Sequence, residues 1–233
     1  MKYSKEKTIE RVKEALQPKM LYNRKFVNWT GITSDTGERY SEIISELLLQ
    51  DLSGFDKTIP QITRKKDYKV DRHTGETTTG NSLATSNRNE EYIALGMFKK
   101  NFEYIGEIID YQTPLKNKRS DRIGKIDLLS YDNCLHMLEL KGQGSKETLL
   151  RCILEIYTYW KTVNREKLVS DFGKPKNTKV CKGILIWKDC QAHKDFEQLP
   201  KTKELARKLE VDVYVLEKND NRIEVKCKLK IDP

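Results

Sequence analysis

The chain has 233 residues, of which 34% are charged and 37% hydrophobic, and its formal net charge is +9. This length suits one sizeable domain with an appendage, or two small ones. There is no run of about 18 apolar residues and no apolar leader segment at the start, so we expect a soluble, cytoplasmic protein without a membrane partner. The positive charge favours an anionic partner, and nucleic acid is the commonest one.

The N-terminal part of the chain reads as two helices joined by less regular segments. Apolar residues at helical spacing predict a helix over residues 4–17 and a second over 40–52. Residues 26–31 fit either a short strand or a packed loop. Residues 57–89 are polar and basic without apolar periodicity, which predicts a loop, a weak hairpin or a segment that orders on a partner. We therefore place a boundary near residue 85.

Regular elements follow from residue 86 onward, and their order predicts an α/β domain with a mixed central sheet flanked by helices. Ser145 is the expected N-cap of the long helix. The expected elements are a helix at 90–101, strands at 104–111, 126–131 and 135–140, a helix at 146–163, a strand at 180–187, a helix at 202–209, and strands at 211–216 and 222–231.

The two central strands carry the residues most typical of a reactive site. Pairing them about a turn at Asp132 and Asn133 brings Asp127 opposite positions 138–139, within a few ångströms of Glu139. Two close carboxylates repel each other unless a cation lies between them, and their oxygens suit Mg²⁺ or Mn²⁺. Lys141 lies two residues after Glu139 and so projects from the same face. The alternative interpretation is a solvated ion pair between Glu139 and Lys141.

This pattern resembles the PD-(D/E)xK nuclease superfamily of restriction-type endonucleases and related exonucleases. The resemblance rests on Gly124-x-Ile126-Asp127, on Glu139-x-Lys141, and on the α-β-β-β-α-β order of residues 89–188. Ile126 stands where the superfamily motif has proline. Glu155-x-x-x-Tyr159 is similar to the QxxxY element of the RecB-like branch, with glutamate in place of glutamine.

The resemblance implies a restriction endonuclease-like core with an N-terminal helical extension, and a metal-dependent nuclease acting on DNA. Catalytic roles then fall on four side chains, with the Leu140 carbonyl and Glu91 as further metal ligands beside Asp127 and Glu139. The four catalytic residues are Asp127, Glu139, Lys141 and Glu155. Glu91 has an equally good alternative role as an acid that complements the dipole at a helix start.

Basic residues surround the expected site and are candidates for phosphate contacts. The loop before residue 126 carries several of them, and the Gly142–Ser145 segment offers backbone N–H groups. The nucleic-acid candidates are Lys116, Lys118, Arg119, Arg122, Lys125, Gln143, Ser145 and Tyr159. Lys174, Lys176 and Lys179 form a third basic stretch, for which contact with nucleic acid and a solvated surface are both open.

Several alternatives stay open at this level. The substrate is expected to be DNA, with RNA not excluded, and the role would be restriction, defence or repair. The competing hypothesis is a catalytically silent nucleic-acid-binding module with a nuclease fold. Residues 1–85 would supply substrate recognition or a homodimer interface. The five cysteines include no CxxC pair, which argues against both a disulfide framework and a structural zinc site.

Overall fold

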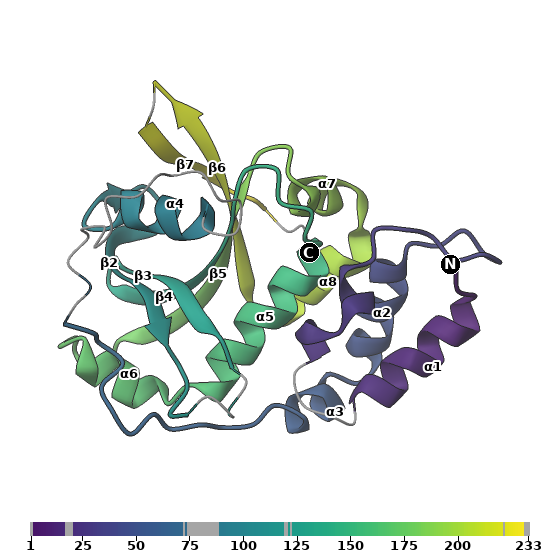
Figure 1. The fold of residues 1–233 in the computed structure, drawn as a ribbon, viewed down its shortest axis with the longest axis horizontal. Helices are drawn as coiled ribbons and strands as arrows, with labels where there is room; N and C mark the ends of the chain where they lie inside the picture. Colours follow the sequence, from purple (N-terminus) through teal and green to yellow (C-terminus); the bar gives the residue numbers. More distant parts are fainter. Residues whose placement is uncertain are drawn as a thin grey trace.

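The structure is a computed structural model that describes residues 2–16, 21–71, 73, 89–118, 121, 123–220 and 222–230. Helices and strands follow one another along the chain, and the strands form a single sheet (Figure 1). The helices are α1 (Lys5–Leu16), η1 (Leu21–Asn23), η2 (Lys25–Asn28), α2 (Tyr40–Gln50), α3 (Leu52–Lys57), α4 (Asn89–Met97), α5 (Leu149–Thr162), α6 (Arg165–Asp171), α7 (Gln191–Gln198) and α8 (Pro200–Lys208). None of the described helices is long and apolar enough to cross a membrane.

The strands form one mixed sheet, as the sequence predicted. Its order follows the chain, with antiparallel pairing except for the parallel pairs β4–β5 and β5–β6. The strands are β1 (Asn101–Phe102), β2 (Gly106–Pro114), β3 (Lys125–Tyr131), β4 (Cys134–Lys141), β5 (Lys179–Trp187), β6 (Val211–Asn219) and β7 (Arg222–Lys228).

The sheet curls until it is nearly barrel-like. The two edge strands, β1 and β7, both line one cavity of about 720 Å³, with Phe102 on one side and Val225 on the other. Helix α4 packs against β2, β3 and β4, and α5 packs against β4 and β5 (Figure 1). This arrangement buries β4 and β5 almost completely, because helices cover the central strands. Charged side chains in the middle of β4 are therefore removed from water.

The N-terminal helices pack directly against the rest of the molecule. Buried residues from Val12 to Val225 belong to one core cluster. The Ser45 hydroxyl on α2 lies 3.0 Å from the Thr202 hydroxyl on α8, and both side chains are fully buried. The expected boundary near residue 85 falls outside the described residues. What the structure describes is how the segments before and after it pack together.

Several element limits differ from the predictions. The segment at 26–31 includes most of the 3₁₀ turn η2, and Phe26 and Val27 in it are buried, so of the two alternatives the packed loop is closer and the strand is wrong. The expected helix at 40–52 is divided into α2 and α3, because Asp51 caps a new helix by accepting a hydrogen bond from the Gly54 N–H. Helices α6 and α7 were not predicted; both are short, and α6 lies in a stretch rich in lysine and arginine.

Candidate functional site

The hairpin of β3 and β4 places Asp127 beside Glu139, as the sequence predicted. Leu128 pairs with Leu138, so the next position outward aligns residue 127 with residue 139. Beyond the last paired residues of the two strands, the Asp127 carboxylate accepts the next hydrogen bond from the β4 backbone. Its Oδ2 accepts a hydrogen bond of 2.9 Å from the Leu140 N–H, and its Oδ1 accepts one of 3.0 Å from the Gln112 side chain. Asp127 is thereby held against both neighbouring strands.

Lys141 is the cation at the centre of this cluster. Its Nζ lies 2.7 Å from Glu139 Oε1 and 2.8 Å from Glu147 Oε2. Glu155 Oε2 lies 4.0 Å away on α5. Both Lys141 and Glu139 are at most 5% exposed, so the sequence alternative of a solvated ion pair does not describe them. The attraction between a buried ammonium group and the carboxylates around it is strong, because the dielectric constant inside the protein is low.

The α5 helix brings two expected residues to the same point. Glu155 Oε1 accepts a hydrogen bond of 2.7 Å from the Tyr159 hydroxyl, one helical turn later. Tyr159 in turn packs edge-on against Tyr22 of the N-terminal extension. Tyr159 is only 3% exposed, so its described environment is the protein interior rather than a surface that nucleic acid would contact.

Three buried carboxylate oxygens in the cluster lack a hydrogen bond from the described residues: Glu139 Oε2, Glu147 Oε2 and Glu155 Oε2. Buried carboxylate oxygens without a donor are rare, because the lost hydration is not replaced. Glu147 Oε2 and Glu155 Oε2 still lie within 4.0 Å of the Lys141 ammonium. Glu139 Oε2 has no such ion pair among the described residues, so it marks the place where a further positive group fits best.

Burial and charge crowding change the protonation of the cluster. Burial, opposed by Lys141, raises the pKa of the Asp127 carboxyl to about 7. Burial, together with the charges of Asp127 and Glu155, holds the pKa of Glu139 well above its usual range. Burial disfavours the Lys141 ammonium, but the neighbouring carboxylates outweigh it and hold the pKa of Lys141 well above its usual range. Lys141 is consequently protonated at neutral pH.

The acidic residue of α4 that reaches the site is Glu90. Its Oε1 accepts a hydrogen bond of 3.1 Å from the Gly142 N–H, and its charge contributes to the raised pKa of Asp127. Glu91, the sequence candidate for an outer metal ligand, is exposed. Adjacent helix positions point about 100° apart, so only one of the two can face the hairpin.

The long helix begins later than expected, which changes the surroundings of Gln143 and Ser145. The N-cap is Thr148, whose hydroxyl accepts from the Arg151 N–H at 3.3 Å, and Ser145 lies in the preceding loop. The Leu149 N–H already donates to the Asp195 carboxylate. Gln143 is exposed in the same loop. The N–H groups of Leu149 and Arg151 at the helix start are thus occupied by protein side chains.

The basic loop before β3 is joined to a second basic segment far away in the sequence. The Asn117 side chain donates to the Thr63 carbonyl at 3.0 Å and accepts from the Lys65 N–H at 2.6 Å. The Arg64 guanidinium donates to the Lys116 carbonyl. Exposed lysines of this joined surface, which we call the basic ridge, are Lys65, Lys66 and Lys118.

The remaining nucleic-acid candidates have varied positions. Lys125 is exposed at the start of β3, and Lys116 is half-buried in the loop. Arg119 and Arg122 lie outside the described residues. In the third basic stretch, Lys176 and Lys179 are exposed, whereas the Lys174 ammonium lies 3.9 Å from the centre of the Tyr131 ring.

Four side chains of the cluster were not among the sequence candidates: Glu90, Gln112, Glu147 and Arg151. The spacing Glu147-x-x-x-Arg151-x-x-x-Glu155 was visible and predicts three charges on one helix face. Gln112 carried no such signal, because its role depends on the pairing of β2 with β3.

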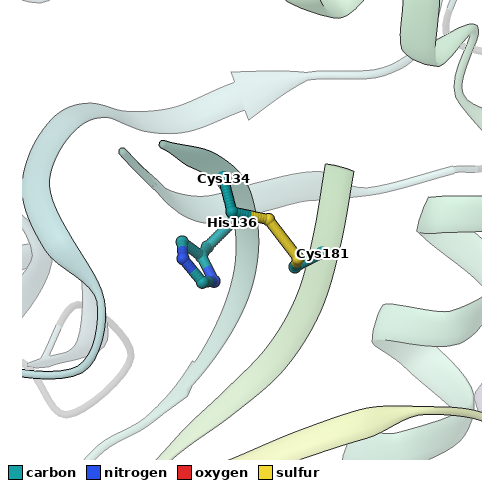
Figure 2. Close-up of side chains that lie close together, drawn as sticks. All are labelled: Cys134, His136 and Cys181. Atoms are coloured by element: carbon teal, nitrogen blue, oxygen red, sulfur yellow. A yellow bond between two sulfur atoms is a disulfide. The ribbon is translucent and has the colours of Figure 1, made fainter. Parts of the chain in front are cut away.

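The cysteine prediction was wrong in one respect. Cys134 on β4 and Cys181 on β5 form a disulfide, with an S–S distance of 2.13 Å (Figure 2). The spacing of 47 residues in the chain contains no local signal for it. Parallel pairing of the two strands, which depends on the whole crossover through α5, brings the two residues together.

Comparisons with protein-family models, with curated proteins and with solved structures found no match to this chain.

Proposed function

We propose that the protein is a Mg²⁺- or Mn²⁺-dependent nuclease that hydrolyses DNA phosphodiester bonds, with a restriction endonuclease-like core. Apart from the two-residue strand β1 and the short helix α6, the elements run α4-β2-β3-β4-α5-β5, which supports this proposal because it follows the α-β-β-β-α-β order of that core. The observation that carries the proposal is the buried convergence of Asp127, Glu139 and Lys141 on one end of the β3–β4 hairpin.

The donor set fits a hard divalent cation. Carboxylates outnumber cations in the cluster, and Glu139 Oε2 is buried without a donor among the described residues. Asp127 and Glu139 would hold the ion, with the Leu140 carbonyl as a further oxygen ligand. A bound ion would polarise the phosphate and lower the pKa of its water. The carboxylates are Glu90, Asp127, Glu139, Glu147 and Glu155, and the cations are Lys141 and Arg151.

Lys141 would serve as a positive charge and hydrogen-bond donor beside the phosphate. In the metal-free protein the neighbouring carboxylates hold the pKa of Lys141 well above its usual range, so its ammonium is charged there at neutral pH. A fixed ammonium group stabilises the negative charge that develops on the phosphate and orients the attacking water. Glu155 would act by keeping its Oε2 near the Lys141 ammonium, because the Tyr159 hydroxyl holds its Oε1.

The basic ridge supplies a surface for the phosphate backbone. Gly124, which follows the basic segment of Lys116 and Lys118 in the chain, approaches the Tyr159 hydroxyl closely. Arg64 and Asn117 tie the two halves of the ridge together, so its charges act on one surface. Contacts of this kind attract DNA without reading its sequence.

The test is cleavage of plasmid, linear and single-stranded DNA, and of RNA, with Mg²⁺, Mn²⁺ or EDTA. We expect metal-dependent DNA cleavage that falls at least about 100-fold in Asp127→Asn and in Lys141→Met, because a positioned group of this kind contributes that much. Lys182→Met is the matched control: Lys182 is also buried on the sheet, but its ammonium faces Trp160 and Glu210. Circular dichroism checks that each variant folds.

The outcomes separate the two hypotheses. Cleavage at the wild-type rate in Asp127→Asn and Lys141→Met would overturn the enzyme proposal. Binding that weakens steeply with salt, without any cleavage by the wild-type protein, would support the silent binding module instead. Cleavage of RNA but not of DNA would support the proposed active site and identify RNA as its substrate.

A further inference from the structure

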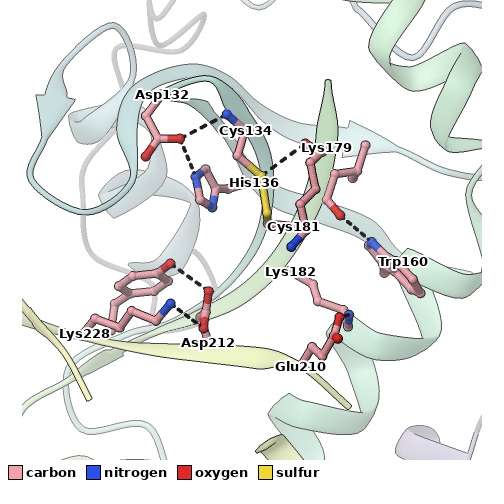
Figure 3. Close-up of a disulfide and its surroundings, with 12 residues drawn as sticks. Asp132, Cys134, His136, Trp160, Lys179, Cys181, Lys182, Glu210, Asp212 and Lys228 are labelled. Atoms are coloured by element: carbon pink, nitrogen blue, oxygen red, sulfur yellow. Dashed lines mark hydrogen bonds and ion pairs between the residues drawn. A yellow bond between two sulfur atoms is a disulfide. The ribbon is translucent and has the colours of Figure 1, made fainter. Parts of the chain in front are cut away.

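A second cluster of ligand-type side chains lies on the opposite face of β4. In the parallel β4–β5 pair, His136 is directly opposite Cys181, and Cys134 lies two residues before His136 on the same face (Figure 3). Glu139 and Lys141 alternate onto the other face. This second cluster is therefore independent of the nuclease site and of whether that proposal holds.

The three side chains are close enough to share one ion. One ligand atom from each of Cys134, His136 and Cys181 lies within 4.8 Å of the others. His136 is only 6% exposed, whereas the two cysteines are half-buried. Two sulfurs and one imidazole nitrogen are ligands that Zn²⁺ prefers, and a water molecule would complete the usual four.

Asp132 holds the His136 ring in place. Its Oδ1 lies 2.8 Å from His136 Nε2, and the same oxygen accepts the Cys134 N–H at 3.2 Å. Figure 3 shows this carboxylate at the turn, bridging the ring and the strand. Histidines that bind metals usually donate their other ring N–H to such a carboxylate, which leaves the remaining nitrogen free to ligate.

We propose that Cys134, His136 and Cys181 form a Zn²⁺ site in the reduced protein, and that the Cys134–Cys181 disulfide closes it. A dithiol reductant opens the site: the S–S bond takes two electrons and two protons, and the reductant becomes a disulfide. Zn²⁺ then binds the two sulfurs as thiolates and releases their two protons to solvent. The two forms are mutually exclusive, because each sulfur is either in the disulfide or on the metal.

The experiment uses the full chain, oxidised or reduced with a phosphine, which takes oxygen from water to become its oxide. Co²⁺ and Zn²⁺ are titrated into each form. We expect thiolate-to-cobalt absorption that saturates at about one equivalent in the reduced protein and is absent from the oxidised protein, whereas Co²⁺ held by the carboxylates around Asp127 gives no such absorption in either form. Because the two forms have the same sequence, this comparison does not depend on any substitution.

Variants identify the ligands. Cys134→Ser, Cys181→Ser and His136→Asn should each lose the cobalt spectrum, and Asp132→Asn should weaken Zn²⁺ binding about 10- to 100-fold. Cys227→Ser is the control, a half-buried free cysteine on β7 of the same sheet. The proposal is overturned if the reduced wild-type chain binds Zn²⁺ no more tightly than Cys181→Ser, or if Cys227→Ser removes binding.

Discussion

At the scale of single residues, the protonation of Asp127 dominates the candidate nuclease site. Its carboxyl is held by the Leu140 N–H and by Gln112, yet burial still raises its pKa to about 7. The charged form is therefore disfavoured in the metal-free protein near neutral pH. A cation beside it would reverse that balance, because an opposite charge favours the carboxylate.

This raised pKa predicts how stability changes with pH. The folded chain binds more protons at Asp127 than the unfolded chain between pH about 4 and about 7, so the free energy of unfolding falls as pH rises through that window. The raised pKa of Glu139 acts in the same direction. The measurement is the melting temperature in EDTA from pH 5 to 8, which should decline.

Two variants check the origin of that decline. Asp127→Asn should make the decline shallower, because only the contribution of Glu139 remains, whereas Glu197→Gln, which changes an exposed acid on α7, should leave it as in the wild type. Mg²⁺ should raise the melting temperature more at pH 8 than at pH 6, since protons compete with the ion. A profile that rises with pH in EDTA would contradict the assignment.

At the scale of elements, the loop before β3 is fitted closely to α5. A Cβ added at Gly124 would lie 2.1 Å from the Tyr159 hydroxyl oxygen, so Gly124→Ala must displace the tyrosine that holds Glu155. We expect a loss of about 1–3 kcal/mol in the free energy of unfolding, from overpacking. Chemical denaturation measures it.

The control for this substitution is a glycine with free space around it. A Cβ at Gly96 in α4 has no heavy atom within 4 Å, and helix propensity favours alanine there by about 1 kcal/mol. Gly96→Ala should therefore be neutral or stabilising. Equal losses in the two variants would show that the contact with Tyr159 is not the cause.

A second prediction at this scale concerns the start of α8. Glu42 on α2 accepts hydrogen bonds from the Lys201 and Thr202 N–H groups, at 3.0 Å and 2.9 Å, and so performs the capping that no residue next to α8 provides. Glu42→Ala should cost about 0.5–2 kcal/mol of stability. Glu46→Ala removes the same charge one turn later on α2 and should cost less than half as much.

At the scale of the whole molecule, the N-terminal helices and the sheet share one core. Thr148, the N-cap of α5, donates through its N–H to Asn28 and through its hydroxyl to the Val27 carbonyl. Tyr22 packs on Tyr159. The N-terminal extension therefore supports the helix that carries Glu155, in addition to any role in recognition.

This packing predicts a single cooperative unfolding transition for the intact chain. Calorimetry should give one peak with equal calorimetric and van't Hoff enthalpies. Cys227→Ser, which lies outside the shared core, should leave the peak single. Two separated transitions, one of them assignable to the N-terminal helices, would instead show that those helices form an independent unit.

Local patterns predicted most of the elements and the centre of the candidate site. The turn at Asp132 and Asn133 sets the register of β3 and β4, which in turn places Asp127 beside Glu139. Alternation along β4 put Lys141 on the same face. These relations involve neighbours in the chain, so periodicity and turn chemistry were sufficient to find them. The start of α5 was misplaced because Ser145 and Thr148 are both acceptable caps.

The sequence by itself determined the mixed α/β class, the hairpin and the acidic and basic character of the candidate site. Tertiary structure alone decided which distant segments meet: Arg64 with Lys116, 52 residues apart, and Cys134 with Cys181, 47 residues apart. The physical reason is that such contacts depend on strand pairing and helix packing summed over the whole chain, whereas periodicity reports only which face of an element is buried.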